Sequence, residues 1–472
     1  MISSIRVPLR AGLERTKIQM TRSRAKKLPT MPRAYYTTVS AAQRHLSAAA
    51  AVPAFDSSSF DDPDRLFQDI SLEQIHALAA QRPTPLRLAD MYKYGRGEDP
   101  KQRLRNAQFL HKELPIRIAQ RAVDLLTLPH GLSTAEPIRR VASMYLEYMV
   151  ELQKFPAPTT YEDDEAFTKL IGGFVWDRKT IPVSIARGVA LWRKSLDNKK
   201  VPAEVEQEME EALYRFFTAR VGLRLLTEHH VLSCKGNPER KAAVLNCMQL
   251  FKDEKTDLGC IKSDLDVVYE VKRVAELVRE QTMMYLELAQ LDKQCPEIII
   301  VDCNRESEPF TFVPHHLHYI VSELLKNSIR ATLRHGLNEP IKVVIAKGAE
   351  DVTIKIADRG GGIPRSRMST IWKFAHSTRN DNELETEFGA DGVSGASIRG
   401  FGLPLARIYA RYLGGELTLK SCEGYGLDTY LYLPCLGDSC EHLPLRVRHS
   451  PGEQDSMPTV YDERVTPNKK SM

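Results

Sequence analysis

No stretch of this 472-residue chain approaches the run of about 20 apolar residues that a membrane-spanning helix requires. Hydrophobic residues make up 42% of the chain, which is ordinary for a globular protein. The length is sufficient for two or three domains of typical size. We therefore expect a globular protein with more than one domain and without a transmembrane segment.

Paired cysteine motifs are also missing. None of the eight cysteines forms a Cys-x-x-Cys pair, and no Cys-His set has zinc-finger spacing. We expect free thiols in a reducing compartment. His315, His316 and His318 lie close enough in sequence to suggest a metal cluster. Because neighbouring positions on a helix point in different directions, the start of a helix is the better interpretation of these histidines.

Acidic residues are scarce at the N-terminus. Before Asp56 the only acidic residue is Glu14, against ten arginines and lysines, and the same stretch is rich in Ser, Thr and Ala. This composition, without an apolar signal core, is typical of a mitochondrial presequence, and a basic tail for nucleic acid or a membrane surface is the alternative. We predict that residues 1–55 are a presequence and linker, that the mature chain begins between about residues 35 and 55, and that nucleic acid is not a partner.

The common phosphate-transfer signatures do not occur. The His-Arg-Asp, Asp-Phe-Gly and Val-Ala-Ile-Lys motifs of eukaryotic protein kinases are missing. The glycine-rich Walker A loop of P-loop proteins is missing too. A kinase built from this chain would therefore need a different nucleotide-binding fold.

One amphipathic segment, residues 315–335, carries an unusual polar triad. Read as a helix, it places Glu323, Asn327 and Arg330 on one face at i, i+4 and i+7. A carboxylate, an amide and a guanidinium on one face can hold a cation beside an anion. Mg-nucleotide is the obvious candidate, because Mg²⁺ prefers oxygen ligands that it shares with substrate phosphates. Taken alone, the triad is better explained as an ordinary solvated helix face, because such triads are common.

Two glycine clusters follow this segment. Residues 351–357 alternate like a strand and lead into Asp358 and three consecutive glycines, which permit unusual φ angles and close approach of the backbone to a flat ligand. Asp358 can accept a hydrogen bond from an exocyclic amine such as that of adenine. Gly400 and Gly402 then open a predicted helix at 402–413, whose free N–H groups suit phosphate oxygens. The order of these elements favours a nucleotide site over a solvated helix face.

These three segments resemble the N-box, G1 box and G2 box of the GHKL ATPase superfamily, which histidine kinases, Hsp90, gyrase and MutL share. Within that superfamily the chain resembles the mitochondrial 2-oxoacid dehydrogenase kinases, which include pyruvate dehydrogenase kinase and branched-chain 2-oxoacid dehydrogenase kinase. Further similarity occurs at residues 109–119, 220–224 and 410–415. The resemblance spans roughly residues 60 to 445.

The resemblance implies an ATP-dependent protein serine kinase that uses Mg²⁺. Glu323 would be the general base or orienter for the acceptor serine hydroxyl, and Asn327 would coordinate Mg²⁺. Arg330 or Lys326 would support the phosphates, and Asp358 would receive adenine N6. The other ATP-binding residues that the resemblance implies are Gly360, Gly362, Ser377, Thr378, Gly400, Phe401, Gly402 and Leu403.

The periodicities and the resemblance together predict an α+β protein. We expect an all-α helical bundle over 60–255, with an insertion at 233–257, and then a GHKL α/β sandwich over 258–436 with helices on one face of its sheet. A lid is expected at 364–399 and a weakly ordered polar tail at 437–472. Helices are expected at 101–127, 134–153, 163–172, 181–197, 203–231, 264–290, 315–335 and 402–413, and strands at 297–302, 341–347, 351–357, 416–421 and 428–433.

The resemblance also implies a matrix enzyme and a homodimer, with the helical domain docked on the lipoyl-bearing core of a 2-oxoacid dehydrogenase complex and the decarboxylase alpha subunit as substrate. Residues 108–119 and 436–439 favour the pyruvate complex, whereas Tyr319 resembles the branched-chain kinases. The chain departs from the family pattern at 398–399, where Ile-Arg replaces part of the glycine loop, and at Leu427, where threonine is usual. These departures leave open a nucleotide-binding scaffold without transfer activity.

A histidine kinase is a further alternative. His229 and His230 lie on a predicted helix of the bundle, and a bundle histidine is the phosphoacceptor in histidine kinases. The residues around them do not resemble that family's histidine motif, and no receiver-like domain follows. We therefore favour transfer to serine.

Overall fold

The computed structural model describes residues 70–95, 100–177, 181–196, 201–233, 259–288, 290–303, 310–336, 339–348, 350–374, 400–435 and 440–444. All of them belong to one compact unit that begins at Phe60. The predicted presequence lies outside the described residues, as do Ser377, Thr378 and residues 398–399. The same is true of the predicted insertion, apart from its first residue.

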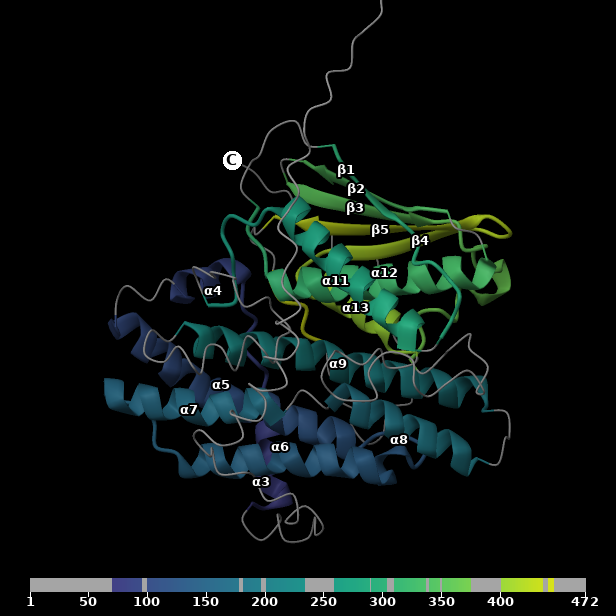
Figure 1. The fold of residues 1–472 in the computed structure, drawn as a ribbon. Coiled ribbons are helices and arrows are strands. Elements are labelled where there is room, and N and C mark those ends of the chain that lie inside the picture. The colour runs from purple at the N-terminus through teal and green to yellow at the C-terminus, as the bar shows by residue number, and fades with distance from the viewer. Residues whose placement is uncertain are drawn as a thin grey trace, which may run out of the picture. The chain divides into compact units, whose positions relative to one another are not determined.

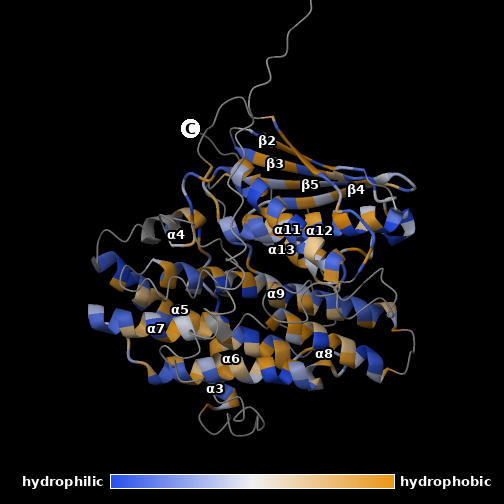
Figure 2. Ribbon diagram, viewed as in Figure 1, coloured by the Kyte–Doolittle hydropathy of each residue, from blue (hydrophilic) through white to orange (hydrophobic). Residues whose placement is uncertain are grey.

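The N-terminal part is helical, as predicted (Figure 1). Two short helices that the sequence analysis did not single out come first, and the Ser71 capping box starts the first of them. Most helices carry both hydrophobic and hydrophilic residues, which suits elements buried on one side (Figure 2). The elements are α3 (Leu72–Ala79), α4 (Leu88–Gly95), α5 (Pro100–Leu126), η2 (Leu132–Thr134), α6 (Glu136–Lys154), α7 (Tyr161–Asp177), α8 (Ile181–Ser195) and α9 (Ala203–Leu232).

The C-terminal part contains a five-stranded sheet of order β1-β2-β3-β5-β4, in which β1 and β2 are parallel and the other pairs antiparallel. Its strands are β1 (Ile298–Asp302), β2 (Ile341–Lys347), β3 (Asp351–Asp358), β4 (Glu416–Cys422) and β5 (Gly426–Pro434). Helices α11 (Val267–Leu288), α12 (Pro314–His335) and α13 (Gly402–Tyr412) lie on one face of the sheet, between it and the helical part (Figure 1). The predicted α+β fold is therefore confirmed.

Alternating burial explains why the helices gather on one face. Along β2 the side chains of Ile341, Val343 and Ile345 are buried, and the residues between them are exposed or half-buried. Successive side chains of a strand point to opposite faces, so this pattern gives the sheet one apolar face for the helices. No helix of the described residues is both long and apolar enough to cross a membrane.

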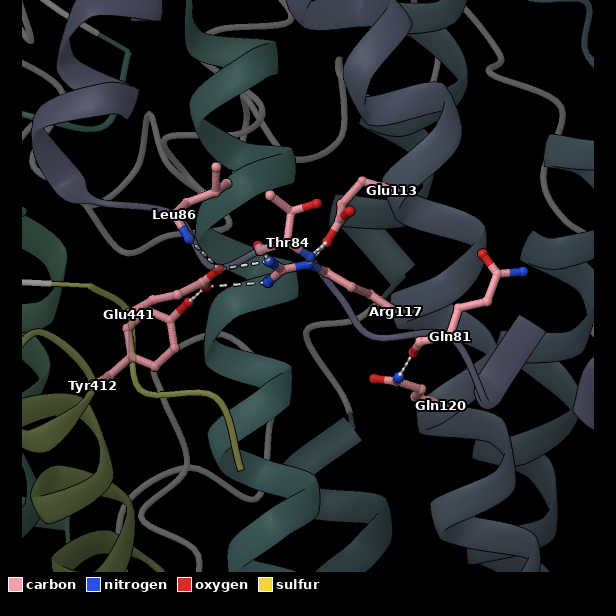
Figure 3. Close-up of polar contacts among 8 residues, drawn as sticks. All are labelled: Gln81, Thr84, Leu86, Glu113, Arg117, Gln120, Tyr412 and Glu441. Carbon is pink, nitrogen blue, oxygen red and sulfur yellow. Dashed lines mark hydrogen bonds and ion pairs between the residues drawn. The ribbon is translucent and has the colours of Figure 1, made fainter. Parts of the chain in front are cut away.

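Residues 440–444, the described part of the polar tail expected at 437–472, are not weakly ordered. Glu441 is only 8% exposed, and its carboxylate accepts hydrogen bonds from Arg117 at 2.5 and 3.1 Å (Figure 3). The Leu86 N–H and the Tyr412 hydroxyl donate to the same carboxylate. A buried carboxylate with four donors holds residues 440–444 against α5 and the end of α13, which composition alone does not reveal.

Candidate active site

Helix α12 forms the floor of the candidate site. It begins with Pro314 in its first turn and ends at His335, and the following Gly336, with a φ of 76°, closes the helix in the left-handed region. Its polar triad is not a solvated face, because Glu323 is only 5% exposed, while Asn327 and Arg330 are half-buried. A carboxylate of a soluble protein is rarely buried without a specific partner or role.

The start of α13 closes over Glu323. A Cβ atom on Gly402 would lie 2.1 Å from Glu323 Oε2, so any other residue there would displace the carboxylate. Lys326 Nζ lies 3.5 Å from Glu323 Oε1 and gives the carboxylate a cation on its own helix. Two of the motifs singled out in the sequence therefore meet in space, although 79 positions separate Glu323 from Gly402 in the sequence.

The loop after β3 contacts α12 at Ala331, two turns beyond Glu323. Asp358 is buried at the end of the strand, and its carboxylate accepts hydrogen bonds from Gly360 N–H (3.0 Å), the Ser328 hydroxyl and the Leu427 main chain. Burial raises the pKa of Asp358, and these hydrogen bonds oppose the rise. A Cβ on Gly360 would lie 2.4 Å from the Ala331 Cβ, so glycine lets this loop rest directly on α12.

The contacts of Asp358 also bear on Leu427, where the chain departs from the family pattern. Leu427 supports Asp358 through its main chain, so a change of side chain at 427 leaves that hydrogen bond in place. Ser328 lies on the buried side of α12, and the sequence analysis did not single it out. The helical pattern carried no signal for its bond to Asp358, because that bond depends on where β3 ends.

Strand β4 holds the rest of the loop that follows Asp358, residues 361–363. Gly361 and Gly362 have φ values of 82° and 68°, conformations that favour glycine. Ser421 Oγ accepts from the Ile363 N–H at 2.6 Å and donates to the Ile363 carbonyl at 2.8 Å. Sequence reasoning missed Ser421, because it lies in a strand 58 positions away and no local motif marks it.

The N-terminus of α13 offers main-chain donors rather than an aromatic cover. Gly400 has a φ of 72°, and no side chain of the described residues caps the helix at Phe401. The N–H groups of the first turn have no partner within the helix and are available to an anion. The ring of Phe401 is fully buried, so in this structure it does not cover the site, whereas Leu403 is half-buried.

Together these elements form an elongated site along α12. Glu323 lies at the end near α13, and Ala331, eight residues and about 12 Å farther along the axis, lies at the end near Asp358. Asn327 and Arg330 lie between them on the same face. One end thus has a buried carboxylate beside a helix N-terminus, and the other has a hydrogen-bond acceptor beside a glycine loop. This arrangement suits a ligand with a planar amine at one end and phosphates at the other.

The side chains near the site also indicate how a metal ion could bind. The described residues contain no group of three His, Cys, Asp or Glu side chains that could hold an ion by themselves. Mg²⁺ commonly binds through one or two protein oxygens and takes its other ligands from phosphates and water. The amide oxygen of Asn327, one turn from Glu323, fits that kind of shared site.

The histidines of α12 have separate surroundings. His315 Nε2 lies 3.5 Å from Glu228, and His318 Nε2 lies 2.9 Å from Glu270. The His316 ring packs on Tyr409 at a centroid distance of 4.7 Å. The His315 and His316 rings also pack edge-on against each other at 4.4 Å, whereas His318 has its own carboxylate partner, so the three rings do not converge on one point.

Helix α9 buries both histidines that suggested a histidine kinase. Burial lowers the pKa of His229 to about 4, and the pKa of His230 also falls well below its usual value. His230 lies 3.0 Å from Thr168 Oγ1 and 3.3 Å from Asn106 Nδ2, within the helical part. Both rings are buried, so neither is exposed as a phosphoacceptor would need to be.

Both parts of the chain match known protein families. Residues 85–262 match the family described as mitochondrial branched-chain alpha-ketoacid dehydrogenase kinase, and residues 312–436 match the histidine kinase-, DNA gyrase B- and HSP90-like ATPase family. The chain is 34% identical to the mitochondrial [pyruvate dehydrogenase (acetyl-transferring)] kinase of Arabidopsis thaliana, over 80% of this chain and 98% of that protein. The protein of the same name from Drosophila melanogaster is 30% identical over 76% of this chain and 84% of its own length. Isozyme 4 from Homo sapiens is 29% identical over 79% and 86%, respectively.

Proposed function

Because the chain belongs to the family of mitochondrial 2-oxoacid dehydrogenase kinases, we propose that it is an ATP-dependent protein serine kinase that phosphorylates and inactivates the decarboxylase alpha subunit of the pyruvate dehydrogenase complex. The observation that carries the chemistry is the buried Glu323 carboxylate against the first turn of α13. The names of the similar proteins support pyruvate dehydrogenase as the target.

The geometry supports a role for each end of the site. Asp358 accepts the adenine amine, and the N-terminus of α13 faces the phosphates. Lys326 and Arg330 offset the negative charge of the phosphates, and Glu323 accepts the proton of the attacking serine hydroxyl. Phosphoryl transfer depends chiefly on such positioning and charge stabilisation.

Mg²⁺ is part of this proposal, with Asn327 as its protein ligand; when bound, the ion neutralises charge on the phosphates. Ser377 and Thr378 are proposed ATP-binding residues that lie outside the described part of the chain. For Gly400, Phe401, Gly402 and Leu403 the proposed contribution is the main chain of the helix start, because the Phe401 ring is buried.

We also propose a homodimer, with the helical part docking on the lipoyl domain of the acyltransferase core. A surface that supports a second copy is the sheet face opposite the helices, where Ile299 and Tyr432 are exposed. Tyr432 lies between the buried Leu431 and Leu433 and therefore points away from the helices.

The test of function compares two substrates. Purified protein, radiolabelled ATP and either the pyruvate or the branched-chain dehydrogenase complex are incubated together, and dehydrogenase activity is followed. We expect faster inactivation of the pyruvate complex, with acid-stable label on its decarboxylase alpha subunit. Faster loss of branched-chain activity would correct the substrate but not the chemistry. ATP binding without transfer would indicate a scaffold, and acid-labile label on the kinase itself would indicate a histidine kinase.

Localisation to the mitochondrial matrix is proposed from the N-terminal composition and the family. We expect a fusion of residues 1–55 to a fluorescent reporter to enter mitochondria and to be shortened by cleavage. A fusion in which alanine replaces the arginines of this segment is the control and should stay outside. Retention of the unaltered fusion in the cytosol or nucleus would contradict the presequence and favour a basic binding tail.

A further inference from the structure

Helix α9 holds the chain immediately before residue 375 by two polar contacts. The main-chain N–H of Phe374 donates to Glu210 Oε2 at 2.7 Å. The side-chain amine of Lys373 lies 2.6 Å from Glu206 Oε2, one turn earlier on the same helix. These contacts join positions more than 160 residues apart in the sequence.

Phe217 of the same helix forms an aromatic cluster with Phe374 and Phe401, which lie before residue 375 and after residue 399. The ring of Phe217 stacks on Phe374, with a centroid distance of 5.2 Å and an interplanar angle of 23°. It meets Phe401 edge-on at 5.9 Å, and Phe374 lies 5.3 Å from Phe401. All three rings are at most 2% exposed. Such a cluster is worth more than its buried area alone, because aromatic pairs have preferred geometries.

This aromatic cluster adjoins the candidate active site. Phe401 precedes Gly402, the residue that approaches Glu323. Arg407, in the second turn of α13, lies over the Trp372 ring at 4.2 Å. Residues 372–374 therefore lie against both α9 and α13. A movement of α9 would be transmitted to the start of α13 through the contacts of Phe401 with Phe217 and Phe374.

We propose that Glu210, Glu206 and Phe217 of α9 act as positioning residues that hold residues 372–374 and Phe401, and so set the affinity of the site for ATP from the helical part. The inference rests on the proposed function only in taking ATP as the occupant of the site. It adds a regulatory route, because any partner that moves α9 would alter nucleotide binding. Glu210 is the central contact, since it accepts the Phe374 N–H directly.

The electrostatics of Glu210 make this contact sensitive to pH. The pKa of Glu210 is raised to about 7, chiefly by burial and in smaller part by the neighbouring Glu206. The Phe374 N–H, Arg193 on α8 and Lys373 act to lower it. The arrangement in which Glu210 is buried has the higher pKa, so proton binding favours it. The buried arrangement is therefore favoured when Glu210 is protonated, and it weakens as the pH rises from the ordinary range of a carboxyl group to about 7, although the Phe374 N–H contact itself favours the ionised form.

The test uses three single variants of the full-length protein. Glu210→Ala removes the acceptor for the Phe374 N–H, whereas Glu210→Gln keeps an oxygen there and removes the titration. Glu211→Ala is the matched control, because it removes the neighbouring carboxylate, which bonds to Gln207 on the same helix. Equilibrium binding of Mg-ATP, steady-state kcat and KM, and amide hydrogen exchange of residues 370–374 and 400–405 are measured at about pH 6 and about pH 8.

We expect Glu210→Ala to weaken ATP binding about fivefold, to raise KM more than it lowers kcat, and to speed amide exchange in both peptides by a similar factor. Glu210→Gln should match the wild type at the lower pH and lose the decrease in affinity that the wild type shows at the higher pH. Wild-type behaviour of Glu210→Ala in both binding and exchange would overturn the proposal, as would identical losses in Glu210→Ala and Glu210→Gln. If the wild type binds no ATP, the proposed function fails, and the exchange data still decide the positioning role.

Discussion

Replacing Glu323 with glutamine is expected to lower the rate of phosphate transfer by about 10²–10⁴-fold while ATP affinity stays near the wild-type value. Glutamine has the same shape, so the close approach of Gly402 and the neighbouring Lys326 can persist. An amide cannot accept the proton of the attacking serine, and the transfer step loses its general base. Single-turnover transfer to the decarboxylase and equilibrium ATP binding separate the two effects.

Asn327→Ala is the contrasting variant. Asn327 lies one helical turn beyond Glu323 and is half-buried, so its loss should weaken Mg-ATP binding itself. A loss of ATP binding in Glu323→Gln would identify Glu323 as a structural residue and place the base elsewhere. Transfer at the wild-type rate in both variants would show that the site is wrongly assigned.

Arg117→Met is expected to lower the free energy of unfolding by about 3–5 kcal/mol. Arg117 is buried between two carboxylates and bonds to Glu113 at 2.8 Å and to Glu441 at 2.5 Å. It also donates to the Thr84 carbonyl at 2.8 Å. Removing the guanidinium leaves two buried carboxylates without their cation, which costs far more than the loss of an exposed pair. Urea unfolding followed by far-ultraviolet circular dichroism measures the change.

The control for this variant is Arg140→Met. Arg140 pairs with Glu136 one turn away on α6, and both side chains are exposed, so we expect a cost of at most about 1 kcal/mol. Combining Arg117→Met with Glu441→Gln should recover part of the loss, because one of the two buried charges is then neutral. If Arg117→Met is no more costly than Arg140→Met, the buried cluster does not hold residues 440–444 in place.

Elements with a clear period were predictable from the sequence alone. The helix expected at 315–335 is Pro314–His335, and the strand expected at 351–357 is Asp351–Asp358. Local backbone preference and the spacing of apolar residues determine such elements, and both can be read within a short window. The glycine cluster after Asp358 could also be predicted, since Gly361 and Gly362 have the positive φ angles that their sequence context suggested.

The contacts between distant segments could not be predicted in this way. The tail expected to be weakly ordered places Glu441 on Arg117, 324 positions away in the sequence. The ring of Phe401, a residue expected to bind ATP, packs on Phe217 and Phe374. Each of these contacts depends on how whole helices pack together, and no local pattern encodes that packing.

The sequence by itself determined the α+β class, the order of the elements and the family, because periodicity, glycine placement and motif order are local properties of the chain. Tertiary structure alone decided that Glu323 is buried against Gly402, that Ser421 holds the glycine loop, and that α9 reaches the start of α13. Burial and hydrogen bonding depend on which surfaces meet after folding. The chemical groups of the site were thus readable in the chain, whereas their environment arose from packing.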